Sequence, residues 1–413
     1  MYCGSCLRDN TLAMALKEAG HDILLIHVYT PTRTDEPSVG LDRVFLGGIN
    51  VFLQEHVPFL RKIPKRLDRF LDSARLLKLA TRRGVSVDPA RLGRLTVSML
   101  RGTNGSQRKE ILELVRFLEE VSPEIVSLPN SLLIALAPAI KTALNVPVCC
   151  TLQGEDIFLE GLGDPHRQDA IGLIREHAAS VDAFVAVSRF GADQMAGYLG
   201  IDRSRVHVVP LGIRFDGYSR ANLDAEPFTI GYLARVAPEK GLYVLCEAYR
   251  RLRLRPGLPP SRLRAAGYLT PEHKGYLAGI RKTMASWGLS AHFQYQGELG
   301  REEKLAFLRT ANVFSVPATK ADQKGLFLLE AMATGIPVVQ PRRGAFIEIV
   351  ESTGGGILVE PDSPDALAEG ILDLWRDSEK RKNLGSAAFE GVRAHYNAAR
   401  MLDATLEVYR RLR

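Results

Sequence analysis

The chain has 413 residues, of which 46% are hydrophobic, 24% charged and 7% aromatic, and its net charge is +7. This length predicts two or three domains, and the composition excludes a disordered or fibrous protein. The positive charge favours anionic ligands or surfaces. Five cysteines form no secreted disulfide framework, and the apolar runs are shorter than the roughly 20 residues of a spanning helix. We expect a cytoplasmic protein, soluble or peripheral at the inner face of the membrane, without a signal sequence.

The first elements are a helix and a buried strand. The pattern LAMALKEAG, with an N-cap at Asp9 or Asn10, predicts a helix ending at Gly20. The apolar run Ile23–Tyr29 predicts a parallel strand. A crossover unit needs a strand before its helix, and the sequence has none there.

Cys3-Gly-Ser-Cys6 has three interpretations. A thioredoxin-like redox pair would need a preceding strand. A zinc half-site would need a second pair, and Cys149-Cys150 has the wrong spacing. We favour a loop at a helix N-terminus, where Gly4 and Ser5 offer amides to donor phosphates or to the acceptor.

The segment Arg61–Arg83 alternates basic and apolar residues at helical spacing. Such a helix can lie on an anionic membrane surface, within reach of a lipid-linked acceptor. The alternative is a solvated helical face packed on its domain through leucines. Nucleic acid is not expected as a partner, because aromatic platforms and a reader motif are missing from the sequence.

Helices and strands then alternate. Gln153 and Glu155 follow the strand Val146–Leu152, and ligands of open α/β sheets bind beyond the carboxyl ends of strands. We expect Gln153 to hydrogen-bond to donor or acceptor, although polar loops at strand ends are common. The other elements predicted in this half are helices at 108–121, 131–143, 166–178 and from about 190, and strands at 125–128, 183–188 and 206–213.

The second half begins after a polar hinge at 214–227. A strand at 228–234 leads into a loop with Arg235 and Lys240, two cations suited to clamping a diphosphate; the alternative is a surface loop with solvated charges. Gly297 opens a later loop at a strand end. Further strands are predicted at 263–268, 292–297, 313–319, 336–339 and 355–361, and helices from about 241, up to 287, and at 302–310, 364–376 and 379–413.

The stretch Ala321–Pro341 carries the main site prediction. A helix at Leu326–Ala333 follows Gly325, and amides at such a helix start attract an anion. Glu330 lies one turn deeper, where it can accept hydrogen bonds from sugar hydroxyls, and Asp322 adds a second carboxylate. A nucleotide sugar suits this combination. The alternative is an ordinary helix with one outward carboxylate.

This stretch resembles the signature of the family 4 retaining glycosyltransferases, in which two acidic residues are separated by seven. Here they are Asp322, where the family usually has Glu, and Glu330. The loop with Arg235 and Lys240 is similar to the family's Gly-Arg-Leu…Pro-Glu-Lys-Gly element, with Ala234 at the usual Gly. The resemblance covers nearly the whole chain.

The resemblance implies an α/β, GT-B fold: two doubly wound Rossmann-like domains facing a central cleft. The expected parts are an acceptor-side domain at 1–213, a hinge at 214–227, a nucleotide-sugar domain at 228–390, and a helix at 391–413 that crosses back. It also implies that the first strand of the N-terminal domain is absent from this sequence and lies upstream of Met1.

The implied activity is transfer of a sugar, with retained configuration, from a nucleoside diphosphate sugar to a hydroxyl acceptor in polysaccharide or glycolipid synthesis. No cofactor or metal is expected. The implied roles are leaving-diphosphate stabilisation by Arg235 and Lys240, phosphate binding by amides of Gly325 and Leu326, ribose binding by Glu330, sugar binding by Asp322, and nucleobase packing near Gly297. Two alternatives remain: a GT-B epimerase or phosphorylase, and a catalytically impaired nucleotide-sugar-binding protein.

Overall fold

The computed structural model describes residues 4–29, 34–46 and 89–412, which form two compact units. The N-terminal unit comprises residues 5–209 and the chain from Leu402 onwards. The C-terminal unit comprises residues 210–401 together with Gly4. The last helix, α18 (Ala398–Arg410), therefore contributes to both. The basic segment 61–83 and Cys3 lie outside the described residues.

The N-terminal unit contains two parallel sheets. β1 (Leu25–Val28) pairs with β2 (Gly40–Phe45). The other sheet has the order β3-β4-β5-β6, formed by Val126–Leu128, Val148–Leu152, Ala183–Ala186 and Val206–Val208. Every residue of β4 and β5 is buried, as expected where helices cover both faces of a parallel sheet. No ladder joins the two sheets within the described residues.

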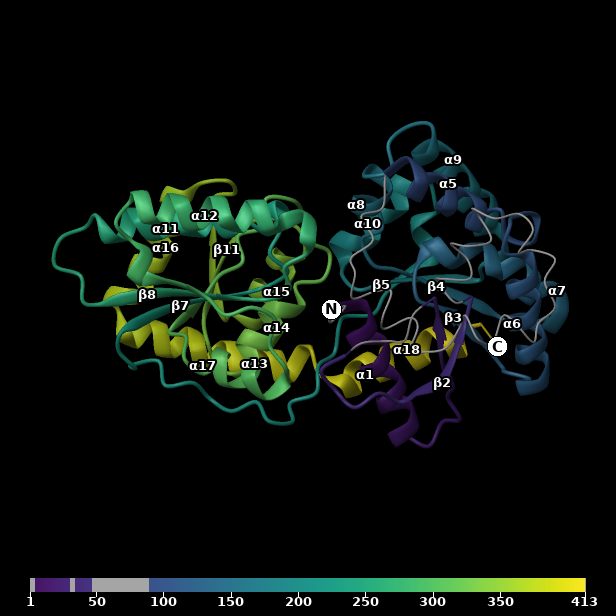
Figure 1. Ribbon diagram of the computed structural model, residues 1–413. Helices are drawn as coiled ribbons and strands as arrows, with labels where there is room; N and C mark the ends of the chain where they lie inside the picture. Colours follow the sequence, from purple (N-terminus) through teal and green to yellow (C-terminus); the bar gives the residue numbers. More distant parts are fainter. Residues whose placement is uncertain (1–3, 30–33, 47–88, 413) are drawn as a thin grey trace. The chain divides into compact units, whose positions relative to one another are not determined.

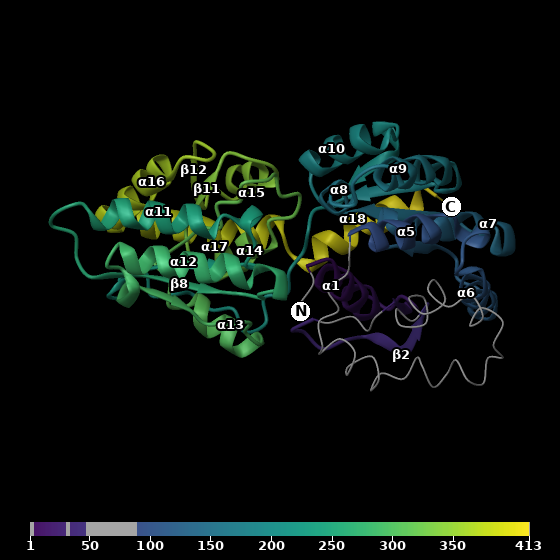
Figure 2. The same ribbon diagram turned by 45° about the horizontal axis from the view of Figure 1, so that its top comes forward.

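Helices surround this second sheet. Figures 1 and 2 show α9 and α10 on one face, and α1 and α18 on the other. The helices are α1 (Gly4–Glu18), α5 (Pro89–Leu100), α6 (Arg108–Val121), α7 (Ala137–Leu144), α8 (Asp156–Glu160), α9 (His166–His177) and α10 (Arg189–Leu199). None of the helices in the described part of the chain has both the length and the apolar character needed to cross a bilayer.

Two helix predictions for this unit are wrong, and the strand predicted at 206–213 ends at Val208. The helix expected at 131–143 is divided into a 3-10 helix at Ser131–Leu136 and α7, because Pro138 lacks an N–H and fits best in the first turn of a new helix. The first helix begins at Gly4 rather than after Asp9 or Asn10. Asn10 is fully buried and does not cap the helix. Its side-chain Nδ2 donates to the Pro37 carbonyl (2.9 Å), and its Oδ1 accepts from the Val39 backbone amide (3.1 Å).

The C-terminal unit is built on one six-stranded sheet in the order β12-β11-β10-β7-β8-β9, in which all neighbours are parallel. Right-handed crossovers place helices on both faces. Figure 1 shows α11, α12 and α16 over one face, and α13, α14 and α17 over the other. The strands are β7 (Phe228–Leu233), β8 (Ser261–Ala266), β9 (Phe293–Tyr295), β10 (Val313–Phe314), β11 (Val338–Pro341) and β12 (Gly356–Val359). The helices are α11 (Leu242–Arg253), α12 (Lys274–Ser286), α13 (Arg301–Leu308), α14 (Leu326–Ala333), α15 (Ala345–Thr353), α16 (Pro364–Arg376) and α17 (Ser378–His395).

The strand predicted at 313–319 is much shorter than expected, since β10 ends at Phe314. Pro317 cannot donate to a ladder, and the Ala318 amide donates to the Val316 carbonyl (2.8 Å), which turns the chain. Residues 315–325 are consequently a long loop that leads into α14.

Candidate functional site

Two loops of the C-terminal unit meet at one point of the sheet edge. From the central strand β7 the chain proceeds to β8 and β9 on one side, and then returns to β10, which pairs with the other side of β7. The order reverses between β7 and β10, and open α/β sheets bind ligands at such switch points. Arg235 and Lys240 follow β7, and Asp322 and Gly325 follow β10. The topology therefore brings these four predicted site residues to one place.

Close backbone packing fixes the two loops against each other. Gly241, at the start of α11, has φ +71°, and a Cβ there would lie 1.8 Å from the Pro317 carbonyl oxygen. Two residues before Gly241 in one loop and two residues after Pro317 in the other, the Thr319 amide donates to the Glu239 carbonyl (3.0 Å). Only glycine fits this contact, because a side chain would meet both strain and a steric clash.

Gly241→Ala is expected to lower the free energy of unfolding of the C-terminal unit by more than about 2 kcal/mol. The alanine would be strained in the left-handed backbone conformation, and its Cβ would clash with the Pro317 carbonyl oxygen. Gly279→Ala is the matched control: Gly279 is in α12, no atom lies within 4 Å of the place that an alanine Cβ would take, and about 0.5–1 kcal/mol should be gained. Both tryptophans, Trp287 and Trp375, belong to this unit, so tryptophan fluorescence during urea unfolding measures both changes. Equal stability of the two variants would contradict the packing argument.

Asp322 joins the two loops through its carboxylate. Oδ2 accepts from Lys240 Nζ (2.5 Å), and Oδ1 accepts from the amides of Lys324 (2.8 Å) and Gly325 (2.9 Å). Burial opposes the charge, but the Lys240 ammonium and the two amides outweigh it and lower the pKa of Asp322 to about 2. A carboxylate has about four acceptor positions, so one direction on Oδ2 is left for a ligand hydroxyl.

The start of α14 offers further donors. Gly325 has φ +61° and precedes the helix, which begins at Leu326. The amides of Leu326 and Phe327 donate to no acceptor among the described residues. The Lys240 ammonium lies 5.5 Å from the centroid of the Phe327 ring, next to this helix end. A positive helix end beside a lysine is suited to an anion such as a phosphate.

Arg235 makes an ion pair with Glu239, four residues further along the same loop. The Arg235 side chain is 36% exposed, so the guanidinium can exchange this partner for a ligand at little cost. Glu239 had no assigned role in the sequence. Pairs within one loop are difficult to predict because they depend on the turn that the loop adopts.

Glu330 is buried in α14 at 7% exposure, which contradicts the alternative of an outward carboxylate. Its Oε1 accepts from Lys304 Nζ (2.5 Å) and from the Tyr218 hydroxyl (3.4 Å). Lys304 lies in α13 and is itself only 8% exposed. Sequence reasoning missed both partners, because a lysine in the pattern REEKLAFL is typical of a solvated helix face.

Gly297 follows β9 with φ +83°, and its carbonyl accepts from the Gly267 amide (2.8 Å). It therefore lies at the carboxyl edge of the same sheet, beyond the neighbouring strands β8 and β9. This position is compatible with the expected role beside a nucleobase.

The remaining predicted site residues belong to the N-terminal region. Gly4 and Ser5 form the first turn of α1. Gln153 follows β4: its backbone amide donates to the Glu155 carboxylate (3.0 and 3.1 Å), and its Nε2 donates to the Pro129 carbonyl (2.8 Å). Oε1 of Gln153 is buried without a hydrogen-bond partner among the described residues.

Cys149 and Cys150 lie in surroundings that suppress thiol reactivity. Cys149 and Cys150 lie fully buried in β4. Burial, with a smaller contribution from Asp182, raises the pKa of the Cys149 thiol to about 12, and burial, assisted by Glu155, raises that of Cys150. Thiols in such surroundings are inert. In the described ranges no three His, Cys, Asp or Glu side chains are grouped to hold a metal ion.

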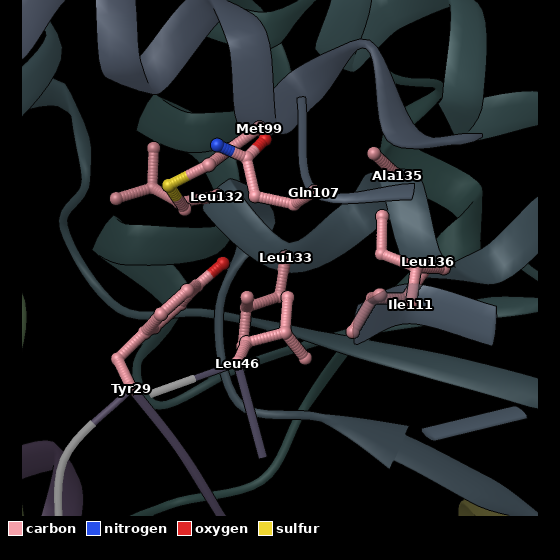
Figure 3. Close-up of a pocket in the computed structure, with 9 residues that line it drawn as sticks. All are labelled: Tyr29, Leu46, Met99, Gln107, Ile111, Leu132, Leu133, Ala135 and Leu136. Atoms are coloured by element: carbon pink, nitrogen blue, oxygen red, sulfur yellow. The ribbon is translucent and has the colours of Figure 1, made fainter. Parts of the chain in front are cut away.

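A small cavity lies at the carboxyl ends of β1 and β2. Its volume is about 10 Å³, enough for one water molecule and too small for a sugar. Figure 3 shows the Tyr29 hydroxyl pointing toward the other lining side chains. Burial raises the pKa of the Tyr29 phenol. The lining residues are Tyr29, Leu46, Met99, Gln107, Ile111, Leu132, Leu133, Ala135 and Leu136.

Comparison with solved structures identifies the fold. Sucrose-phosphate synthase from Thermosynechococcus elongatus superposes with a TM-score of 0.68 at 16% identity, covering 97% of this chain and 91% of that one. Anabaena HepE in complex with UDP and glucose gives 0.63 at 17% identity, covering 74% and 82%. The expected α/β, GT-B fold with two parallel-sheet domains is thereby confirmed.

Sequence comparisons give the family. Residues 219–391 match the family described as glycosyl transferases group 1, and residues 83–216 match glycosyltransferase family 4. The chain belongs to these group 1, family 4 glycosyltransferases, as the Asp322–Glu330 signature indicates.

Two curated relatives illustrate the family. A GDP-mannose-dependent alpha-(1-6)-phosphatidylinositol monomannoside mannosyltransferase of Mycobacterium tuberculosis is 28% identical over 228 residues, covering 52% of this chain and 57% of the relative. The amylovoran biosynthesis glycosyltransferase AmsK of Erwinia amylovora is 26% identical over 264 residues, covering 62% of each. The match thus spans less than two thirds of the length of these relatives.

Proposed function

We propose that the protein transfers a hexose from a nucleoside diphosphate sugar to a hydroxyl acceptor with retention of anomeric configuration. The observation that carries the proposal is the convergence at the β7–β10 switch point. Lys240 and Arg235 belong to one of the two loops that meet there, and the amides of Leu326 and Phe327 follow the other; together these groups are suited to a diphosphate. Glu330, one helical turn deeper, is suited to the ribose.

The proposed chemistry needs only these groups. The bond between the anomeric carbon and the β-phosphate oxygen breaks, a new bond forms to the acceptor oxygen on the same face, and the acceptor proton goes to the departing phosphate. Arg235 and Lys240 offset the charge that develops on the diphosphate. Asp322 accepts a hydrogen bond from one hydroxyl of the transferred sugar, at the acceptor position of Oδ2 that Lys240 leaves open. These cations replace a metal ion, so EDTA should leave the rate unchanged.

The relatives suggest which substrates to test first. The mycobacterial relative is named for GDP-mannose and a phosphatidylinositol mannoside, and the Erwinia relative for the polysaccharide amylovoran. We infer a lipid-linked or polysaccharide acceptor, with the enzyme peripheral at the inner membrane face. Gln153, which follows β4, is the residue proposed to hydrogen-bond to a hydroxyl of that molecule.

The decisive experiment is a thermal-shift screen with UDP-, GDP- and ADP-sugars. At least one donor should raise Tm, and Arg235→Ala should abolish most of that shift because a charged contact to the diphosphate is lost. Arg255→Ala is the matched control, since Arg255 pairs with Glu369 on the surface of the same unit. An undiminished shift in the Arg235 variant would reject the diphosphate assignment.

A nucleotide-sugar-binding protein without turnover is the second candidate. The specific observation in its favour is that the Asp322 carboxylate already has three donors within the protein. Mass spectrometry of incubations with the stabilising donor and lipid or glycan acceptors separates the two functions, and also detects epimerised or phosphorolysed sugar.

A further inference from the structure

The Glu330 carboxylate is held asymmetrically. Oε1 accepts both hydrogen bonds, from Lys304 Nζ (2.5 Å) and from the Tyr218 hydroxyl (3.4 Å). Oε2 accepts none from the described residues, and it is not among their buried unpartnered atoms, so solvent reaches it. One oxygen is thus anchored to the protein, and the other is available to a ligand.

Both anchors have fixed positions. The Lys304 amide donates to the Gly300 carbonyl (2.8 Å) in the first turn of α13, and the Lys304 side chain is 10% exposed. The Arg301 guanidinium, also in this turn, lies 5.5 Å from the Tyr218 ring centroid and donates to the Asp216 carbonyl (2.7 Å). The turn that carries Tyr218 and the helix that carries Lys304 are therefore tied to each other.

Ordering a long buried side chain costs conformational entropy, so the ordered Lys304 side chain must make a compensating interaction. A diol binds a carboxylate best when the carboxylate cannot rotate, because alignment is then achieved before binding. We propose that Lys304 and Tyr218 are positioning residues that hold Oε1 of Glu330 and so present Oε2 to the 2′- and 3′-hydroxyls of the donor's ribose. The inference rests on the proposed function and extends it to residues outside the family signature.

The test is a double-mutant cycle in which one change is made in the protein and the other in the ligand. Dissociation constants are measured by calorimetry for whichever of UDP, GDP and ADP binds, and for its 2′,3′-dideoxy counterpart, which lacks both hydroxyls. Lys304→Met should weaken binding of the ribonucleotide by about 10-fold, which corresponds to one hydrogen bond to a charged group. It should weaken binding of the dideoxynucleotide by less than about 2-fold. Lys304→Arg, which keeps the charge and the donors, should restore most of the ribonucleotide affinity.

Tyr218→Phe removes only a hydroxyl and keeps the ring beside Arg301, so it decides the question even if Lys304→Met fails to fold. It should lower the affinity for the ribonucleotide by about 2- to 5-fold and leave the affinity for the dideoxynucleotide unchanged. Equal losses for both nucleotides, or no loss for either, would overturn the inference while leaving the proposed function intact. If no nucleoside diphosphate binds the wild-type protein, the proposed function fails and the inference fails with it.

Discussion

Replacing Lys240 by Met is expected to lower the turnover number by about 10²- to 10³-fold, the range found when one preorganised donor to a developing negative charge is removed. Lys240 is the cation next to the open amides of α14, 5.5 Å from the Phe327 ring. The affinity for the nucleoside diphosphate should fall as well, because the product carries the same charge. Initial rates at saturating donor and calorimetric titration of the nucleotide measure the two effects.

The substitution also leaves the Asp322 carboxylate without its cation, so lost activity must be separated from lost stability. The double variant Lys240→Met, Asp322→Asn removes both charges and should regain stability without regaining turnover. Lys282→Met is the surface control, because Lys282 is exposed in α12 of the same unit. A Lys240→Met enzyme with more than about a third of the wild-type turnover would refute the proposed role of this lysine.

Elements with strong local signals were predicted closely. The helices at 108–121, 326–333 and 364–376 have the predicted bounds, and the last is marked by the Ser363 cap and Pro364 at its start. The parallel alternation of strands and helices also fixed which loops lie at the carboxyl edge of each sheet. This is why Arg235, Lys240, Asp322 and Gly325 could be expected in one place before the fold was seen.

Contacts between distant segments could not be predicted in the same way. The Lys304–Glu330 pair joins two helices on the same face of the sheet, and its formation depends on how these helices pack. The engagement of Asp322 depends on the turn between Asp322 and Gly325, in which the carboxylate reaches two amides of its own loop. Local periodicity contains no information on either arrangement. The sequence therefore assigned Glu330 and Asp322 only to ligands and not to partners within the protein.

Asp322→Asn is expected to destabilise the C-terminal unit by about 2 kcal/mol at pH 7, and this deficit should shrink in acid. In the folded protein the pKa of Asp322 is about 2, below its ordinary value of 3.8. The ionised carboxylate therefore stabilises the fold fully above about pH 4, and this contribution is lost as the pH falls through the folded pKa. Asparagine keeps the shape and can still accept from the loop amides, so the charge on Lys240 is what the variant fails to match.

Urea unfolding followed by tryptophan fluorescence between pH 7 and pH 3 measures this difference in the unit that contains both tryptophans. The deficit should have fallen to about half by pH 3, because the wild-type carboxylate is then becoming protonated in the unfolded state. Asp365→Asn is the matched control: Asp365 pairs with Arg251 (2.5 Å), but its side chain is 75% exposed, so the substitution should cost less than about 1 kcal/mol at every pH. A deficit for Asp322→Asn that is the same at pH 3 and pH 7 would mean that hydrogen-bond geometry, rather than the Lys240 charge, holds the two loops together.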